Sequence, residues 1–100
     1  MPPQHGVAAK LSDNMSVEYY KKQIIDLRAK LDKEKEAKKH DNEYYANLIK
    51  NSSTPSSKAS YRKNKVDHAA SHDNHIKSIK KQIESAKESL ARERERAKRK

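Results

Sequence analysis

Hydrophobic side chains recur along two segments of the chain at alternating intervals of three and four residues. These positions are Val17, Tyr20, Ile24, Leu27, Leu31, Tyr45 and Leu48 in the first segment, and Ile76, Ile79, Ile83, Ala86 and Leu90 in the second. Such spacing places them on one face of an α-helix, at the a and d positions of a coiled coil. The sequence therefore predicts two long helices that interact along one narrow apolar seam.

A few capping and breaking residues set the ends of these helices. Ser16 is a favourable N-cap, and Glu18 lies in the following turn, where the helix dipole stabilises an anion. Thr54 and Pro55 suit the N-cap and first position of a second helix. The predicted organisation is a disordered lead over residues 1–14 and a helical hairpin over 15–100, with helices at 16–50 and 57–97 and a turn at 51–56.

The two stripes match each other if the chain folds back at this turn. Facing residues in an antiparallel pair have numbers with a constant sum, and one sum is shared by Leu31 with Ile76, Ile24 with Ile83, and Val17 with Leu90. The polar interruption between Glu34 and Asp41 then faces an equally polar stretch of the second helix. The predicted fold is an all-α antiparallel coiled-coil hairpin.

Composition adds a constraint on stability. Only 32% of the residues are hydrophobic and 38% are charged, with no Phe, Trp or Cys. Low hydropathy and high charge are also typical of disordered chains, but the regular periodicity favours helix. A seam between two helices is a thin core, so we expect the hairpin to oligomerise or dock into a larger helical bundle.

Other features bear on compartment and on chemistry. The lack of Cys excludes disulfides, and no run approaches the roughly 20 apolar residues of a membrane span. Without an N-terminal apolar stretch of the secretory type, the expected location is the cytoplasm. The serines near the turn have no glycine-flanked nucleophile among them, and a single glycine cannot build a phosphate-binding loop. We therefore expect neither enzymatic activity nor a cofactor.

Histidines gather near the polar interruption. His68 and His72 are one helical turn apart, and the antiparallel register places His40 at the level of His68. With neighbouring aspartates these side chains are candidate metal ligands, although the lack of Cys and of a tight ligand spacing favours a merely solvated polar segment. A third interpretation is a pH-dependent seam that loosens when the imidazoles become charged.

The formal net charge of +10 indicates a polyanionic partner or a solubilising surface. The densest basic cluster consists of Arg92, Arg94, Arg96, Lys98, Arg99 and Lys100. Interspersed glutamates favour the solubilising role, and no base-reading motif is present. Non-specific, salt-sensitive nucleic-acid binding is therefore the alternative function. The apolar stripe is narrow and lacks Trp and Phe, so packing on a partner helix is preferred to binding a membrane surface.

The turn and the helix after it carry a family resemblance. The run from Ser52 to Arg62 (SSTPSSKASYR), followed by a Lys- and Ala-bearing helix through Ile83, resembles basic helical hairpins that precede TIR-type effector domains in some bacterial proteins. This chain has more His and Tyr and less Ala than that pattern, and its 100 residues include no effector domain. The resemblance implies a stand-alone bacterial adaptor, in a multi-protein or defence system. We expect a non-enzymatic module that binds itself or another protein.

Overall fold

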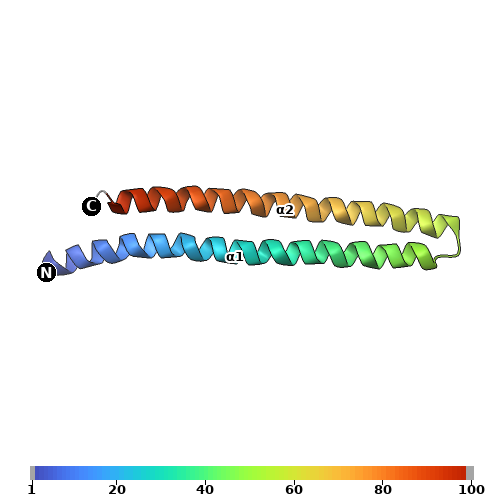
Figure 1. Cartoon of the computed structure of the whole chain (residues 1–100), viewed down its shortest axis with the longest axis horizontal. Helices are drawn as coiled ribbons and strands as arrows, with labels where there is room; N and C mark the ends of the chain where they lie inside the picture. Colours follow the sequence, from blue (N-terminus) through green and yellow to red (C-terminus); the bar gives the residue numbers. More distant parts are fainter. Residues whose placement is uncertain (1, 99–100) are drawn as a thin grey trace. The chain divides into compact units, whose positions relative to one another are not determined.

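Two helices make up the described part of the chain. The computed structural model describes residues 2–98, and for residues 2–14 it describes the backbone alone. Helix α1 (Pro2–Asn51) and helix α2 (Pro55–Lys98) are joined by a short turn, and no strand occurs between residues 2 and 98. The helices are antiparallel and pack against each other (Figure 1). The predicted all-α helical hairpin is confirmed.

The position of the turn follows from the distribution of helix breakers. Neither Gly nor Pro occurs between residues 7 and 54, so nothing interrupts α1 before the turn. Pro55 lacks an amide hydrogen and disfavours a helical conformation at Thr54, the residue before it. The backbone N–H of Ser57 donates to Oγ1 of Thr54 at 3.2 Å, and the N–H of Lys58 donates to the Thr54 carbonyl at 3.1 Å. Thr54 is therefore the N-cap of α2, and Pro55 is its first residue.

The helix boundaries differ from the predicted ones at two places. Helix α2 begins at Pro55 instead of residue 57, because proline fits the first turn of a helix. Helix α1 begins at Pro2 instead of Ser16, so the backbone before Ser16 is helical where a disordered lead was predicted. Extending an existing helix needs no new nucleus, and Pro2 and Pro3 lie in the first turn, where proline is tolerated.

The chain divides into two compact units, each with its own part of the seam. The terminal unit comprises Met1–Ala29 and Lys81–Lys100, and the turn unit comprises Lys30–Lys80. Among residues 15–29 and 81–98 of the terminal unit the buried side chains are apolar, namely Ile24 and Leu27 of α1 and Ile83, Ala86 and Leu90 of α2. Val17 and Tyr20 are half-buried there. This unit has the aliphatic core that the heptad pattern predicts.

The turn unit buries much less apolar surface. Among its residues only Ile79 is a buried hydrophobic side chain. The other apolar seam positions are half-buried, namely Leu31, Tyr45, Leu48 and Ile76. The intervening seam positions of this unit are polar, so its two helices cannot be held together by aliphatic packing alone.

Adjacent residues of α1 provide a direct test of the seam. Ile24 is 6% exposed and Ile25 is 64% exposed. We expect Ile24→Ala to lower the free energy of unfolding by about 2 kcal/mol, the lower end of the range for aliphatic core truncations. Ile25→Ala should change it by less than about 0.5 kcal/mol. Chemical denaturation of dilute protein, followed by circular dichroism, measures both. Equal effects of the two substitutions would contradict the assigned seam.

Candidate functional site: a histidine–carboxylate network

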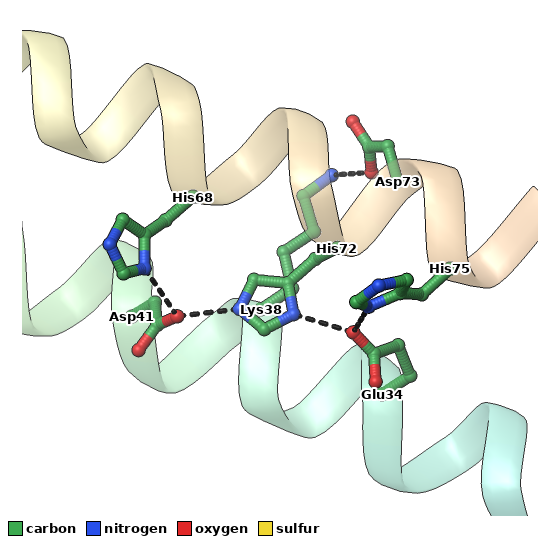
Figure 2. Close-up of polar contacts among 7 residues, drawn as sticks. All are labelled: Glu34, Lys38, Asp41, His68, His72, Asp73 and His75. Atoms are coloured by element: carbon green, nitrogen blue, oxygen red, sulfur yellow. Dashed lines mark hydrogen bonds and ion pairs between the residues drawn. The ribbon is translucent and has the colours of Figure 1, made fainter.

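Seven polar side chains meet at the seam of the turn unit (Figure 2). We call them the seam network: Glu34, Lys38 and Asp41 from α1, and His68, His72, Asp73 and His75 from α2. The three α1 residues are spaced by four and then three positions, and so are the three histidines. Side chains at these intervals lie on one helix face. The same heptad spacing that aligns aliphatic side chains elsewhere therefore aligns titratable groups here.

His72 is the centre of the seam network. Its Nδ1 atom lies 2.6 Å from Oε1 of Glu34, and its Nε2 atom lies 2.5 Å from Oδ2 of Asp41. Its side chain is 17% exposed, so water has limited access to the ring. Figure 2 shows the imidazole between the two carboxylates, both of which belong to α1. One side chain of α2 is thus bound at two points, about two helical turns apart, on the facing helix.

This geometry determines the charge of His72. A neutral imidazole has one N–H donor and one acceptor nitrogen, whereas an imidazolium has two donors. Ionised carboxylates only accept hydrogen bonds, so both ring nitrogens must donate for both contacts to be attractive. Charge-assisted N–H···O bonds are shorter than neutral ones, at about 2.7–2.9 Å, and the two contacts of His72, at 2.5 and 2.6 Å, are closer still. His72 is therefore an imidazolium in this arrangement.

The pKa values of the three groups shift accordingly. The hydrogen bond to Asp41, and next the one to Glu34, raise the pKa of His72 above its ordinary value, although partial burial opposes this. The hydrogen bond from His72, with a further one from His75, lowers the pKa of Glu34. The hydrogen bond from His72 also lowers the pKa of Asp41, and His68 adds to the effect. All three shifts favour the ionised forms.

The outer histidines extend the seam network on both sides. Nδ1 of His68 lies 3.3 Å from the same Asp41 oxygen, and Nδ1 of His75 lies 3.1 Å from the same Glu34 oxygen. His68 needs only one N–H, since its Nε2 atom, 3.2 Å from the Tyr45 hydroxyl, can accept that hydrogen. The rings of Tyr45 and His68 also contact, with centroids 5.0 Å apart. The result is a continuous chain of hydrogen bonds from Tyr45 to His75.

Lys38 makes the remaining interhelical contact. Its Nζ atom donates to Oδ1 of Asp73 at 2.6 Å. Both side chains are substantially exposed, so salt screens the pair and its contribution to stability is modest. The pair also directs the lysine charge toward Asp73, as Figure 2 shows. His72 is therefore the cation that serves both Glu34 and Asp41.

The structure brings together only some of the predicted histidines. His68 and His72 share Asp41, as neighbours on one helix face. His40 is exposed and is not one of the residues of the seam network. Two residues at the same level along facing helices need not point toward each other. His40 lies two residues after the seam position Lys38, which places it on the opposite side of α1. The sequence contains one signal that the prediction did not use: Glu34 and Asp41 lie seven residues apart on the same face of α1, and His72 is a seam position of the facing stretch of α2.

The metal interpretation can also be compared with this geometry. In residues 2–98, no group of three or more His, Asp or Glu side chains is arranged to hold a metal ion. A metal requires a ring nitrogen with a free lone pair, whereas each ring nitrogen of His72 lies within hydrogen-bond distance of a carboxylate oxygen. For His72 the contacts favour the opposite of the expected loosening on protonation, because the hydrogen bonds to Asp41 and Glu34 raise its pKa. Its positive charge is what joins the two helices at this point.

The basic cluster of α2 lies in the terminal unit. Arg92, Arg94 and Lys98 are exposed. Arg92 donates to the Ser89 hydroxyl at 3.2 Å, and Arg96 forms a 2.6 Å ion pair with Glu93. Arg99 and Lys100 lie outside the described residues. Arg94 and Lys98 are thus the exposed cations of this cluster to test first as ligands of a polyanion.

Comparison with known proteins adds no family assignment. No protein-family model, curated protein or solved structure matches the chain. Over residues 2–98, neither helix has a segment that is both long enough and apolar enough to cross a membrane. Inference about function therefore starts from the seam and the charged surfaces.

The charge state of His72 can be measured directly. We expect ¹⁵N NMR of the side chains to show that both ring nitrogens of His72 stay protonated to a higher pH than those of a free histidine, whose ordinary pKa is about 6.5. Asp41→Asn should lower the pKa of His72 more than Glu34→Gln does, because the bond to Asp41 is the larger cause of the shift. Glu36→Gln, at an exposed position of α1, is the control and should leave that pKa unchanged. Equal His72 titrations in Asp41→Asn and Glu36→Gln would contradict the assigned network.

Proposed function

We propose that this chain is a non-enzymatic interaction and oligomerisation module, an adaptor of the bacterial cytoplasm that binds itself or another protein through helix packing. The observation that carries the proposal is the thinness of the core. The buried hydrophobic side chains of the described residues are Ile24, Leu27, Ile79, Ile83, Ala86 and Leu90. A helix pair with so small a core gains stability when further helices cover its surface.

Large apolar side chains outside the seam support this proposal. Over residues 15–98, those that remain exposed are Met15, Tyr19, Ile25, Tyr44 and Val66. Met15 and Tyr19 are one turn apart on α1 in the terminal unit. Tyr19 also packs edge-on against the half-buried Tyr20, with ring centroids 5.1 Å apart, which orders an otherwise exposed ring. A helix of a second copy packed beside α1 would cover these side chains.

Association can be separated from folding by choosing the helix face. We expect Tyr19→Ser with Ile25→Ser to reduce self-association at least about tenfold, as the loss of two interface anchors would. The variant should keep its helicity when dilute, because neither side chain is buried. Sedimentation velocity over a concentration series, with circular dichroism on the same samples, measures both quantities.

The seam variants supply the complementary control. Ile24→Asp or Ile83→Asp should abolish helicity and association together, because each places a charge in the core of the terminal unit. A chain that carries both substitutions and yet remains folded and associated would contradict the proposal. So would a wild-type chain that is monomeric at all concentrations and retains no protein partner from host extract.

Non-specific binding of nucleic acid is the second candidate function. The formal net charge of +10 and the exposed Arg92, Arg94 and Lys98 favour it. Basic side chains bind phosphates and release condensed counterions, and such binding weakens steeply as salt increases. The glutamates of this segment oppose it, and one of them already pairs with Arg96.

A matched pair of variants tests this second candidate. Arg94→Gln with Lys98→Gln, and Lys33→Gln with Lys35→Gln, each remove two exposed positive charges. If the α2 cluster binds phosphates, the first variant should flatten the slope of log affinity against log salt by about 1 to 2, near 0.9 for each lost contact. The second should leave the slope nearly unchanged. Fluorescence anisotropy with a labelled duplex measures both. Salt-independent binding by the wild type, or none at low salt, would exclude this function.

A further inference from the structure

We propose that proton uptake by His72 closes the seam of the turn unit and that loss of this proton loosens it. The hairpin would then respond to pH near neutrality, a property that goes beyond the proposed interaction function and does not depend on it. The inference stands on the position of one ring between two carboxylates of the opposite helix, at 2.6 and 2.5 Å.

Deprotonation of His72 removes an attraction and adds a repulsion. The neutral ring keeps a single N–H, so it can donate to either Glu34 or Asp41 but not to both. At the other contact, a nitrogen lone pair then faces a carboxylate oxygen. The partial burial of the ring limits the water that could relieve this contact. One of the two links between α2 and α1 at His72 must therefore lengthen or break.

The neighbouring charges do not replace the lost proton. The titratable and charged groups that face His72 are Glu34, Lys38 and Asp41 on α1, and His68, Asp73 and His75 on α2. Lys38 is held by Asp73. His68 and His75 approach the carboxylates from more exposed positions and at longer distances, 3.3 and 3.1 Å. His72 is therefore the group whose charge state governs this part of the seam.

The sign of the effect follows from the direction of each pKa shift. Because folding raises the pKa of His72, its contribution is fully present below the unfolded value, about pH 6.5, and is lost as pH rises through the folded value. Folding lowers the pKa values of Glu34 and Asp41, so their contributions are present above about pH 4.3 and are lost as pH falls through the lowered values. The seam network is strongest between these limits, roughly pH 5 to 6.5.

Two features make the turn unit responsive to this one proton. Ile79 is its only buried apolar side chain among the described residues, so little aliphatic packing is available to hold the seam closed. The buried side chains of residues 15–29 and 81–98 in the terminal unit do not titrate. We therefore expect the response to pH to be concentrated in residues 30–80.

Thermal unfolding of the full chain at about pH 6 and about pH 8.5 tests the proposal, because the ordinary histidine pKa lies in this interval. Dilute protein is used, so that association does not contribute to the melting temperature. The Tm of the wild type should be on the order of 5 °C lower at the higher pH. This is the scale of change that the loss of one favourable interaction causes in a domain of this length. His72→Gln should melt at nearly the same temperature at both values. His72→Arg, charged at both, should retain the higher Tm.

The controls distinguish this effect from general electrostatics. His40→Gln, at an exposed position outside the seam network, should behave as the wild type does. Acidification increases a net charge that is already +10, so general repulsion lowers Tm at acid pH, opposite to the predicted change. A wild-type Tm that rises or stays constant between the two pH values would overturn the proposal. A fall in the Tm of His72→Gln as large as that of the wild type would also overturn it. This outcome does not depend on whether the chain associates.

Discussion

The structure depends on a single constraint, which is that two helices can bury only one narrow stripe between them. Each seam position therefore has a large share in holding the pair together. In the terminal unit the stripe is filled by Ile24, Leu27, Ile83, Ala86 and Leu90. In the turn unit a large part of it is filled by charged and polar groups, and the helices there depend on electrostatic complementarity. The same heptad repeat thus supports aliphatic packing in one unit and electrostatic pairing in the other.

The polar part of the seam has consequences for specificity and for regulation. Two aliphatic stripes can still pack together after one helix slides by a heptad. A histidine that must lie between two particular carboxylates can do so in one register only. The same contacts make the pairing conditional on a proton, because both ring nitrogens of His72 must donate. A module of this kind could change how firmly its turn unit is closed without changing its fold. That property suits a protein whose proposed role is to bind other helices.

Much of this architecture could be predicted from residue spacing. The six buried hydrophobic side chains of residues 15–98 all belong to the heptad pattern, namely Ile24, Leu27, Ile79, Ile83, Ala86 and Leu90. Thr54 and Pro55 suited the N-cap and first position of α2, because capping and proline sterics are local effects, although the predicted helix began two residues later. The predicted start of α1 at Ser16 was wrong, because a favourable N-cap does not prevent a helix from extending further toward the N-terminus. His40 lies outside the seam network, because equal level along two helices does not fix which face a residue occupies. The charge state of His72 was missed because it depends on which oxygens face each nitrogen, and that requires three-dimensional contacts.

The central claim is that a charged His72 links the helices through carboxylates on α1. A double-mutant cycle between Asp41→Asn and His72→Gln, measured by chemical denaturation, isolates this link from the other effects of each substitution. The account predicts a stabilising coupling at about pH 6 that largely disappears at about pH 8.5, as the imidazolium is lost. Additive effects at both pH values, or a coupling of equal size at both, would contradict it.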